Sequence, residues 1–318
     1  MKKYYGIDWL RAVACIGILV MHIAANTRYT ISGFLYQQVI PSFTDFVYLF
    51  MAISAFGMCC GYYDKVMSGQ VNWTDFYGKR YAKILPFFCL LIVLDLVMNF
   101  SRSALYEGLV ELTLLHGFIP DSLNVIGVGW FLGTVFIFYL TFPFFCVLME
   151  EKRRALWAFL LSIPLNYICL TYFNLNRHNF LCSFCYFLAG GLLYLYKDKL
   201  QNVKWYYSIP ALCLALLVYF LAGGNTLTRL CVVMVLLVCA ISSDCRKSRI
   251  AAFLSSISLE IYLSHMVIFR AVELLGLTKR WGNGWGQFLT TSVLVTAGTV
   301  LFSFVTQRII KHIHVPRK

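Results

Sequence analysis

Ten apolar runs, each long enough to cross a lipid bilayer, divide this sequence. A membrane-spanning helix needs roughly 20 mostly apolar residues, because it rises about 1.5 Å per residue across ~30 Å of hydrocarbon. Only 13% of the 318 residues are charged and 60% are hydrophobic, whereas soluble domains carry about 25% charged residues. We therefore expect an all-α integral membrane protein, a bundle of about ten transmembrane helices. The runs are 7–26, 43–62, 84–100, 129–149, 156–173, 180–196, 206–222, 226–243, 255–274 and 286–305.

The basic residues predict how this bundle is oriented. Nineteen Lys and Arg fall in loops on the side of the N-terminus, five fall in loops on the other side, and Arg11, Arg229 and Arg270 lie within runs. Cytoplasmic loops collect Lys and Arg, so both termini are predicted to be cytoplasmic. The same rule accounts for the net charge of +13 without a nucleic-acid partner. No shift in composition marks a second domain, so one membrane domain is expected over residues 1–318.

The first apolar run carries polar residues that a lipid-facing helix would not hold. Asp8, Arg11 and His22 all lie between Gly6 and Asn26. A charged side chain at bilayer depth costs roughly 2.5–3.5 kcal/mol, so its default interpretation is functional. Arg11 and His22 are eleven residues apart, which gives a difference in direction of only ~20° and an axial rise of ~16.5 Å. This face is predicted to line a wetted cavity enclosed by protein.

A second polar helix face lies in the ninth run. Ser258, Tyr262 and His265 are spaced i, i+4 and i+7, so they share one side of the helix. Arg270 and Glu273, at i and i+3, are close enough to neutralise each other.

The loop before the third run is basic. Lys79, Arg80 and Lys83 stand at the predicted cytoplasmic entry of that run. Ordinary anchoring by positive charge explains them as well as the functional alternative, a site for phosphate groups of a cytosolic ligand.

Five other residues are weaker candidates for a functional role. Trp130 is typical of an aromatic belt, and His116 and His178, each alone in an outer segment, are more typical of packing than of catalysis. Cys182 and Cys185 form a C-x-x-C pair without a second pair at metal spacing, so no metal site is expected.

Four separated motifs make the chain resemble acyltransferase family 3, the integral-membrane enzymes that O-acylate glycans of the cell envelope. They are Gly6–Arg11 with Arg-x10-His ending at His22, Phe50–Phe56 (similar to F-x-I-S-G-F), Lys79–Pro86 (similar to R-x-x-R-I-x-P) and Ile257–His265 (similar to S-x-x-I-Y-L-x-H). A run from Trp130 through Tyr139 to Pro143 also fits. Ala55, Lys83 and Glu260 depart from the usual pattern.

The resemblance implies a bacterial cytoplasmic-membrane enzyme that moves an acyl group, expected to be acetyl, from cytosolic acyl-CoA to a hydroxyl of a glycan or lipid-linked sugar. Acetyl-CoA would be a co-substrate, and no tightly bound cofactor is expected. His22 would act as the base, with Arg11 and Asp8 beside it. Arg80, Lys83, Lys79 and Arg11 would bind CoA, while His265, Tyr262, Ser258 and Trp130 would bind the acceptor or stabilise the oxyanion.

Two alternatives stay open. A related branch, the membrane part of vancomycin-resistance serine racemases, keeps a transporter of a small polar solute such as serine in consideration. A non-catalytic membrane protein is a third interpretation. Membrane lipid is an expected partner, and a homodimer is left open.

Overall fold

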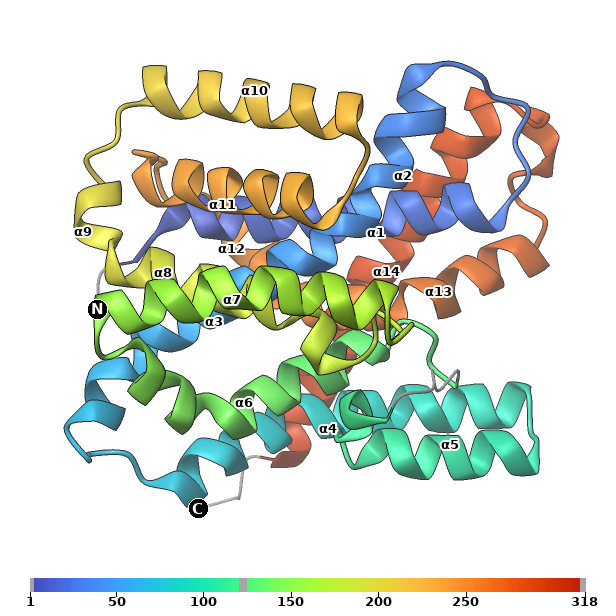
Figure 1. The fold of residues 1–318 in the computed structure, drawn as a ribbon. Helices are drawn as coiled ribbons and strands as arrows, with labels where there is room; N and C mark the ends of the chain where they lie inside the picture. The colour runs from blue at the N-terminus through green and yellow to red at the C-terminus, as the bar shows by residue number, and fades with distance from the viewer. Residues whose placement is uncertain (1–2, 120–124, 315–318) are drawn as a thin grey trace. The chain divides into compact units, whose positions relative to one another are not determined.

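The computed structural model describes residues 3–119 and 125–314. Lys2, Arg317 and Lys318, which the charge count includes, lie outside these residues, as do residues 120–124. The described chain is helical, as Figure 1 traces. Its α-helices are α1 (Tyr5–Asn26), α2 (Ile40–Ser42), α3 (Phe46–Met67), α4 (Trp73–Met98), α5 (Arg102–Leu112), α6 (Trp130–Met149), α7 (Lys152–Thr171), α8 (Phe184–Leu195), α9 (Lys197–Leu200), α10 (Trp205–Ala222), α11 (Thr226–Ser242), α12 (Arg249–Ser256), α13 (Ser258–Leu274) and α14 (Trp285–His314). A π-helical turn, Leu35–Val39, precedes α2, and short 3₁₀ turns cover Phe43–Asp45, His116–Phe118, Phe180–Cys182 and Lys279–Trp281.

Seven helical segments in the described chain are long and apolar enough to cross a membrane, and α12 with α13 makes an eighth if the bent pair is one span. α8 and α11, which cover two predicted runs, are shorter apolar helices of 12 and 17 residues. A helical membrane protein is therefore confirmed, while the count of ten spans and the orientation of the termini stay predictions.

The chain divides into two compact units, each described here by itself. Unit 1 comprises residues 1–7 and 48–246, and unit 2 comprises residues 8–47 and 247–318. The prediction of one domain over 1–318 is untested.

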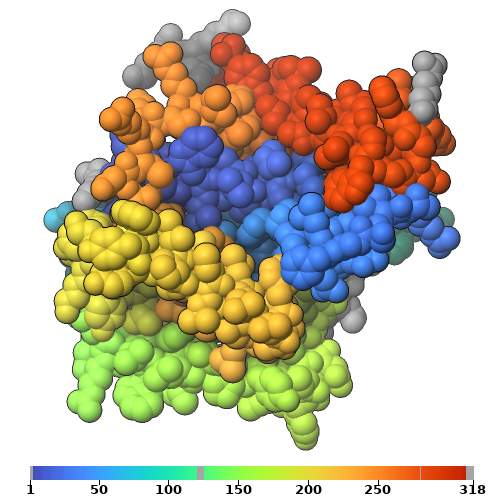
Figure 2. Space-filling view, turned by 90° about the horizontal axis from the view of Figure 1, so that it is seen from above, coloured from blue at the N-terminus to red at the C-terminus, as the bar shows by residue number. Residues whose placement is uncertain are grey.

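Aromatic side chains fill the core of unit 1. Phe138 of α6 stacks on Phe187 of α8 with ring centroids 4.3 Å apart. α8 also approaches α3 so closely that a side chain at Gly190 would collide with the Ala52 carbonyl. In contrast to α8, α10 is mostly exposed, because Ser208 is its only buried residue. Its side chains form an outward face in the space-filling view (Figure 2), as a helix in contact with lipid requires.

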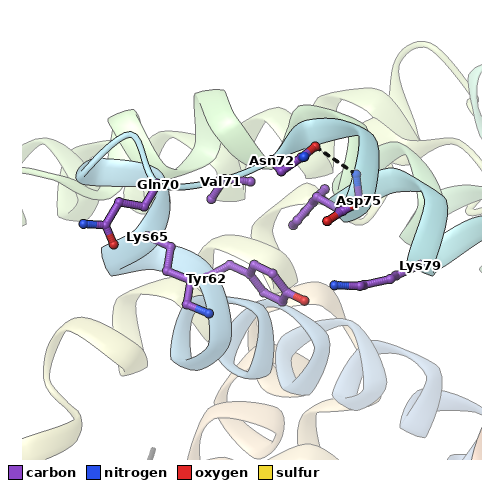
Figure 3. A pocket seen from close by; sticks show the side chains of 8 residues that line it. Tyr62, Lys65, Gln70, Val71, Asn72, Asp75 and Lys79 are labelled. Atoms are coloured by element: carbon purple, nitrogen blue, oxygen red, sulfur yellow. Dashed lines mark hydrogen bonds between the residues drawn. The ribbon is translucent and has the colours of Figure 1, made fainter.

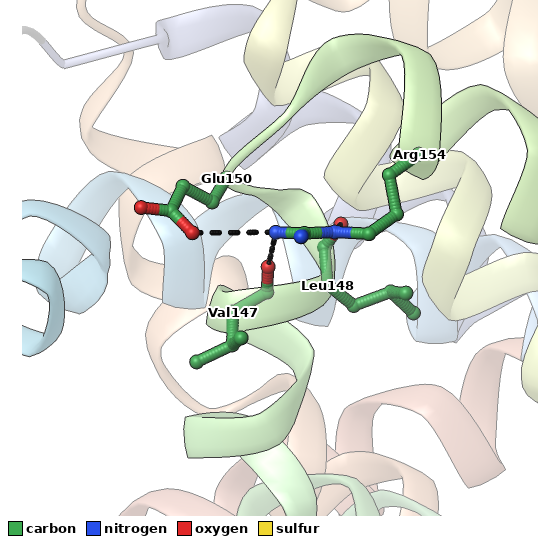
Figure 4. Close-up of polar contacts among 4 residues, drawn as sticks. All are labelled: Val147, Leu148, Glu150 and Arg154. Carbon is green, nitrogen blue, oxygen red and sulfur yellow. Dashed lines mark hydrogen bonds and ion pairs between the residues drawn. The ribbon is translucent and has the colours of Figure 1, made fainter.

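Arg154, in the first turn of α7, caps the C-terminal end of α6. The Arg154 guanidinium donates to the Val147 carbonyl and, at 3.3 Å, to the Leu148 carbonyl at the end of α6. It also pairs with Glu150 at 3.3 Å (Figure 4). Cations near a helix C-terminus satisfy its last carbonyls and favour its dipole.

α5 is a short amphipathic helix. Ser101 caps it by accepting from the Ala104 amide at 3.0 Å. Leu105 and Leu109 are exposed, whereas Gly108 and Glu111 are buried. The leucine face is thus available to lipid, and a carboxyl group lies on the protein side.

In unit 2, α13 packs along α14, and α12 meets α13 at a bend of 69°. Ile257 leaves helical geometry at this bend (φ −112°, ψ 13°), and the Ser258 hydroxyl donates to the Ser255 carbonyl at 3.0 Å. The ninth predicted run, 255–274, is therefore a straight helix only from Ser258 onward.

Candidate active site

Two histidines that are 243 positions apart in the sequence lie side by side in unit 2. His22 of α1 and His265 of α13 have ring centroids 4.9 Å apart, with an angle of 41° between the ring planes. His22 is half-buried and His265 is only 1% exposed. Both were predicted as site residues from separate motifs, and this contact brings them together.

The hydrogen bonds of His265 fix which of its nitrogens carries a proton. Nδ1 lies 2.6 Å from the Tyr262 carbonyl oxygen, which can only accept, so Nδ1 donates. In a neutral imidazole the other nitrogen is then an acceptor. Nε2 is buried and makes no hydrogen bond with any described residue. His265 therefore presents a lone pair in the region of His22.

The face of α1 that carries the charged residues turns toward protein. Asp8 and Arg11 are half-buried and Cys15 is buried, while Trp9 and Val13 on the opposite side are 43% and 56% exposed. Asp8 Oδ1 accepts a hydrogen bond of 2.9 Å from Ser255 Oγ, the buried hydroxyl at the end of α12. Ser255 was missed from the sequence, because only the bend after it brings its hydroxyl to α1.

Buried polar groups continue along the contact between α13 and α14. Glu260 is 4% exposed, and its Oε1 accepts from Gln307 Nε2 at 3.1 Å. Ser264 Oγ and Ser303 Oγ lie 3.3 Å apart. The partner of Glu260, which local spacing does not reveal, thus comes from α14.

A basic pocket of about 190 Å³ lies at the start of α4 in unit 1. Lys65 and Lys79 line it together with Tyr62 and Asp75 (Figure 3). Asn72 caps the helix there by accepting from the Asp75 amide at 3.2 Å. Lys83, one turn beyond Lys79, is exposed.

Arg80 is held against aromatic rings beside this pocket. Its guanidinium carbon lies 3.7 Å from the centroid of the Phe76 ring and 4.5 Å from that of Tyr62. Nη1 donates to the Phe76 carbonyl at 2.7 Å, and Nη2 lies 3.3 Å from the Met58 sulfur. Stacked cation–π contacts of this kind orient a guanidinium.

Trp130, predicted to bind the acceptor, is buried at the start of α6 in unit 1. Its ring stacks on His178 at 4.8 Å, and the Arg177 guanidinium lies 5.4 Å from it. His116 Nε2 lies 3.1 Å from the Gly129 carbonyl. Burial lowers the pKa of His116, and burial, followed by the charge of Arg177, lowers the pKa of His178 to about 4. Neutral, packed imidazoles fit the structural interpretation of both histidines.

The predicted site residues fall into two groups. Asp8, Arg11 and His22 of α1 and Ser258, Tyr262 and His265 of α13 belong to unit 2, while Lys79, Arg80, Lys83 and Trp130 belong to unit 1. Within the described part of the chain no three His, Cys, Asp or Glu side chains are placed to hold a metal ion, and Cys182 and Cys185 are free thiols.

Comparisons with known proteins agree with these motifs. A family profile described as an acyltransferase domain, that of acyltransferase family 3, matches residues 4–308. The acyltransferase MdmB of Streptomyces mycarofaciens is 27% identical over 184 residues, which cover 52% of this chain and 45% of that protein. The match thus spans less than half of that relative's length. No solved structure matches the chain. Because the profile covers nearly every residue from the first helix to the last, the protein belongs to acyltransferase family 3.

Proposed function

We propose that this protein is a membrane-embedded O-acyltransferase that moves an acyl group, acetyl in the simplest case, from cytosolic acyl-CoA to a hydroxyl of a cell-envelope glycan or lipid-linked sugar. Family membership supports acyl transfer as the reaction class. The observation that carries the proposal is the contact between the His22 and His265 rings, since imidazole titrates near neutral pH and is the commonest general base.

In the proposed reaction, His22 removes the proton of the acceptor hydroxyl while its oxygen attacks the thioester carbonyl carbon. The tetrahedral intermediate then collapses, the C–S bond breaks, and the imidazolium of His22 returns the proton to the departing thiolate. The products are an ester and CoA thiol, so no other reactant is required. Arg11, on the same face of α1, would sit near the thioester, and Asp8 would hold this end of the helix through Ser255.

His265 contributes an acceptor rather than a donor in this scheme. Its Nδ1 proton is committed to Tyr262, so Nε2 can accept a hydrogen bond from the incoming hydroxyl or from His22. An oxyanion needs donors. Of the two roles expected for His265, binding of the acceptor hydroxyl is therefore the one that this hydrogen bond favours.

The pocket beside α4 is the proposed contact for phosphate groups of the donor. Lys65 and Lys79 supply compact charges at its wall. Arg80, anchored on Phe76, would orient the helix turn that carries Lys79 and would reach phosphate only with an altered side-chain position. Lys83 extends the basic surface by one turn.

The test is a purified preparation in lipid nanodiscs that receives acetyl-CoA labelled in the acetyl group, with and without lipid-linked sugars as acceptors. We expect label in the sugar product in proportion to CoA thiol released. Label that stays entirely in acetyl-CoA with every acceptor would contradict the proposal.

A second candidate function is transport of a small polar solute such as serine. The specific observation in its favour is the 69° bend between α12 and α13, because broken membrane helices often build substrate sites in transporters. Uptake of labelled serine into proteoliposomes that lack CoA would favour the transporter, and acetyl transfer without uptake would favour the enzyme.

A further inference from the structure

Six buried polar atoms gather at one end of unit 2, where α1 and α13 stop and α14 begins. By hydrogen-bond geometry none of them has a partner among the residues that the structure describes, although the Thr27 and Thr291 hydroxyls interact with the Tyr29 phenol. Buried polar groups are paired in the great majority of cases, so each exception needs a cause. The atoms are Thr27 Oγ1, Tyr29 OH, Glu273 Oε1, Gln287 Oε1, Thr291 Oγ1 and Ser292 Oγ.

Tyr29 is the centre of this cluster. The Thr27 and Thr291 hydroxyls lie close enough to act on the Tyr29 phenol, and the Glu273 carboxyl lies close enough to interact with it electrostatically. Burial is the largest influence and raises the pKa of Tyr29, so the phenol stays protonated. Gln287 and Thr291 are one turn apart on α14 and share a face, and they are only 4% and 0% exposed.

Three aromatic side chains lie beside these polar groups and form an aromatic wall: Tyr36, Trp285 and Phe288. Tyr29 meets Tyr36 and Phe288 edge to face, with centroids 6.3 and 5.3 Å apart. Trp285 packs edge to face on Tyr36 and Phe288 and is 39% exposed. Ligand sites commonly combine such rings with a few convergent polar groups.

The loop that carries Tyr29 is tied in place. The Thr30 amide donates to the Asn283 carbonyl at 2.8 Å, and the Thr30 hydroxyl reaches the same oxygen at 3.3 Å. This joins the loop after α1 to the turn before α14. The cluster is therefore built by the fold and does not depend on a bound molecule to assemble it.

The cluster lies close to the histidine pair along the same helices. Thr27 follows His22 by five residues and Glu273 follows His265 by eight, which correspond to rises of ~7.5 and ~12 Å. Groups held in the cluster are thus one to two helical turns from the two imidazoles.

We propose that this cluster is a subsite for a sugar unit, which binds through its hydroxyl groups against the aromatic wall. Under the function proposed above, on which this inference rests, the sugar belongs to the acceptor. Phenol and threonine hydroxyls both donate and accept, while the Gln287 carbonyl and the Glu273 carboxyl accept, which suits a neutral ligand rich in hydroxyl groups. A phosphate would meet the carboxylate of Glu273 with like charge.

The test compares two buried threonines of the same helix. Thr291→Val removes a hydroxyl inside the cluster, and Thr299→Val is the matched control. Thr299 is equally buried, and its hydroxyl also makes no hydrogen bond with the described residues, but it lies two turns further along α14. Thr299→Val should not lower the melting temperature, since it removes a buried hydroxyl that has no hydrogen-bond partner among the described residues. Thr291→Val also removes an interaction with the Tyr29 phenol and should lower it slightly.

Binding is measured without acetyl-CoA, in nanodiscs of phospholipid alone so that no glycosidic detergent competes. Hexoses, deoxyhexoses and N-acetylhexosamines, as short oligosaccharides, are titrated against tryptophan fluorescence, and Trp285→Phe identifies the reporting ring. We expect saturable binding of a sugar that Thr291→Val weakens about fivefold, the effect of one hydrogen bond. Thr299→Val should bind like the unmodified protein.

Three results would overturn the subsite: no saturable binding of any sugar, equal binding by both variants, or binding of serine in place of sugars. Its failure is separable from failure of the proposed function. Sugar binding without acetyl transfer would retain the subsite and remove the enzyme. Acetyl transfer with unchanged acceptor KM in Thr291→Val would retain the enzyme and remove the subsite.

Discussion

His22 of α1 is the general base of the proposed reaction, so its replacement should lower activity without lowering stability. We expect His22→Ala to lower kcat for acetyl transfer by about 10²- to 10⁴-fold, the usual contribution of a general base. The melting temperature should change little, because His22 is only half-buried. The measurement is initial rate with labelled acetyl-CoA together with a thermal melt in nanodiscs.

His312→Ala, at an exposed position of α14, is the matched control and should keep full activity. Full activity of His22→Ala in a folded protein would remove His22 from the reaction.

The roles of the two ring nitrogens of His265 can be tested separately, because asparagine and glutamine each replace only one of them. Asparagine at position 265 can keep the Nδ1 donor to the Tyr262 carbonyl but has no counterpart of Nε2. We expect His265→Asn to fold normally and to lose at least tenfold in activity, and His265→Gln, which replaces Nε2, to retain more. Circular dichroism and acetyl-transfer rates measure the two effects. A fully active His265→Asn would show that the Nε2 lone pair has no role.

At this scale the sequence predicted which side chains share a helix face better than it predicted their contacts. The eleven-residue spacing of Arg11 and His22 placed both on one face because helical periodicity is local. Arg80 shows the limit: its spacing did not reveal that Phe76 and Tyr62 pack against its guanidinium, and its contact with phosphate stays a prediction. Aromatic partners at i−4 and on another helix are decided by packing, which spacing alone does not specify.

Among the elements, α5 should respond to pH through one buried acid. Burial raises the pKa of Glu111 to about 8, with the nearby Glu107 and Asp95 adding to the rise and the Ile126 amide opposing it. The folded state therefore favours the protonated form. Stability from this group is fully present below its unfolded pKa of about 4.5 and is lost as pH rises toward 8, at a slope of about 1.4 kcal/mol per pH unit.

Hydrogen exchange of the α5 amides between pH 5 and 8, corrected for the intrinsic exchange rate, measures this loss. Glu111→Gln should make the protection of α5 independent of pH, while Glu107→Gln should leave most of the dependence in place. Equal pH dependence in the unmodified protein and in Glu111→Gln would contradict the assignment.

The elements also show where prediction from sequence stops. The runs that became α1, α6 and α10 were identified because hydrophobicity is a property of the run itself. The bend between α12 and α13 was not, since no proline or glycine marks Ser256–Ser258. Ser255 and the Gln307 partner of Glu260 follow from that bend and from the packing of α14, so neither was predicted.

For the whole molecule, the prediction with most consequences is the orientation of its helices across the membrane. Positive charge places the start of α7, which contains Arg153, in the cytoplasm and the start of α5, which contains Ser103, outside. The proposed donor pocket at Lys79 would then face cytosolic acyl-CoA, and the sugar subsite at the end of α1 would face the outer surface. Both assignments depend on the same count of spans.

Cysteines introduced at two exposed positions test this orientation in intact cells. In a background whose exposed native thiols, Cys213, Cys231 and Cys245, are replaced by serine, Ser103→Cys should react with a membrane-impermeant maleimide. Arg153→Cys should react only after the membrane is permeabilised. The opposite pattern would place the basic pocket outside, where acyl-CoA is absent, and the donor side of the proposed reaction would fail even if both histidines proved essential.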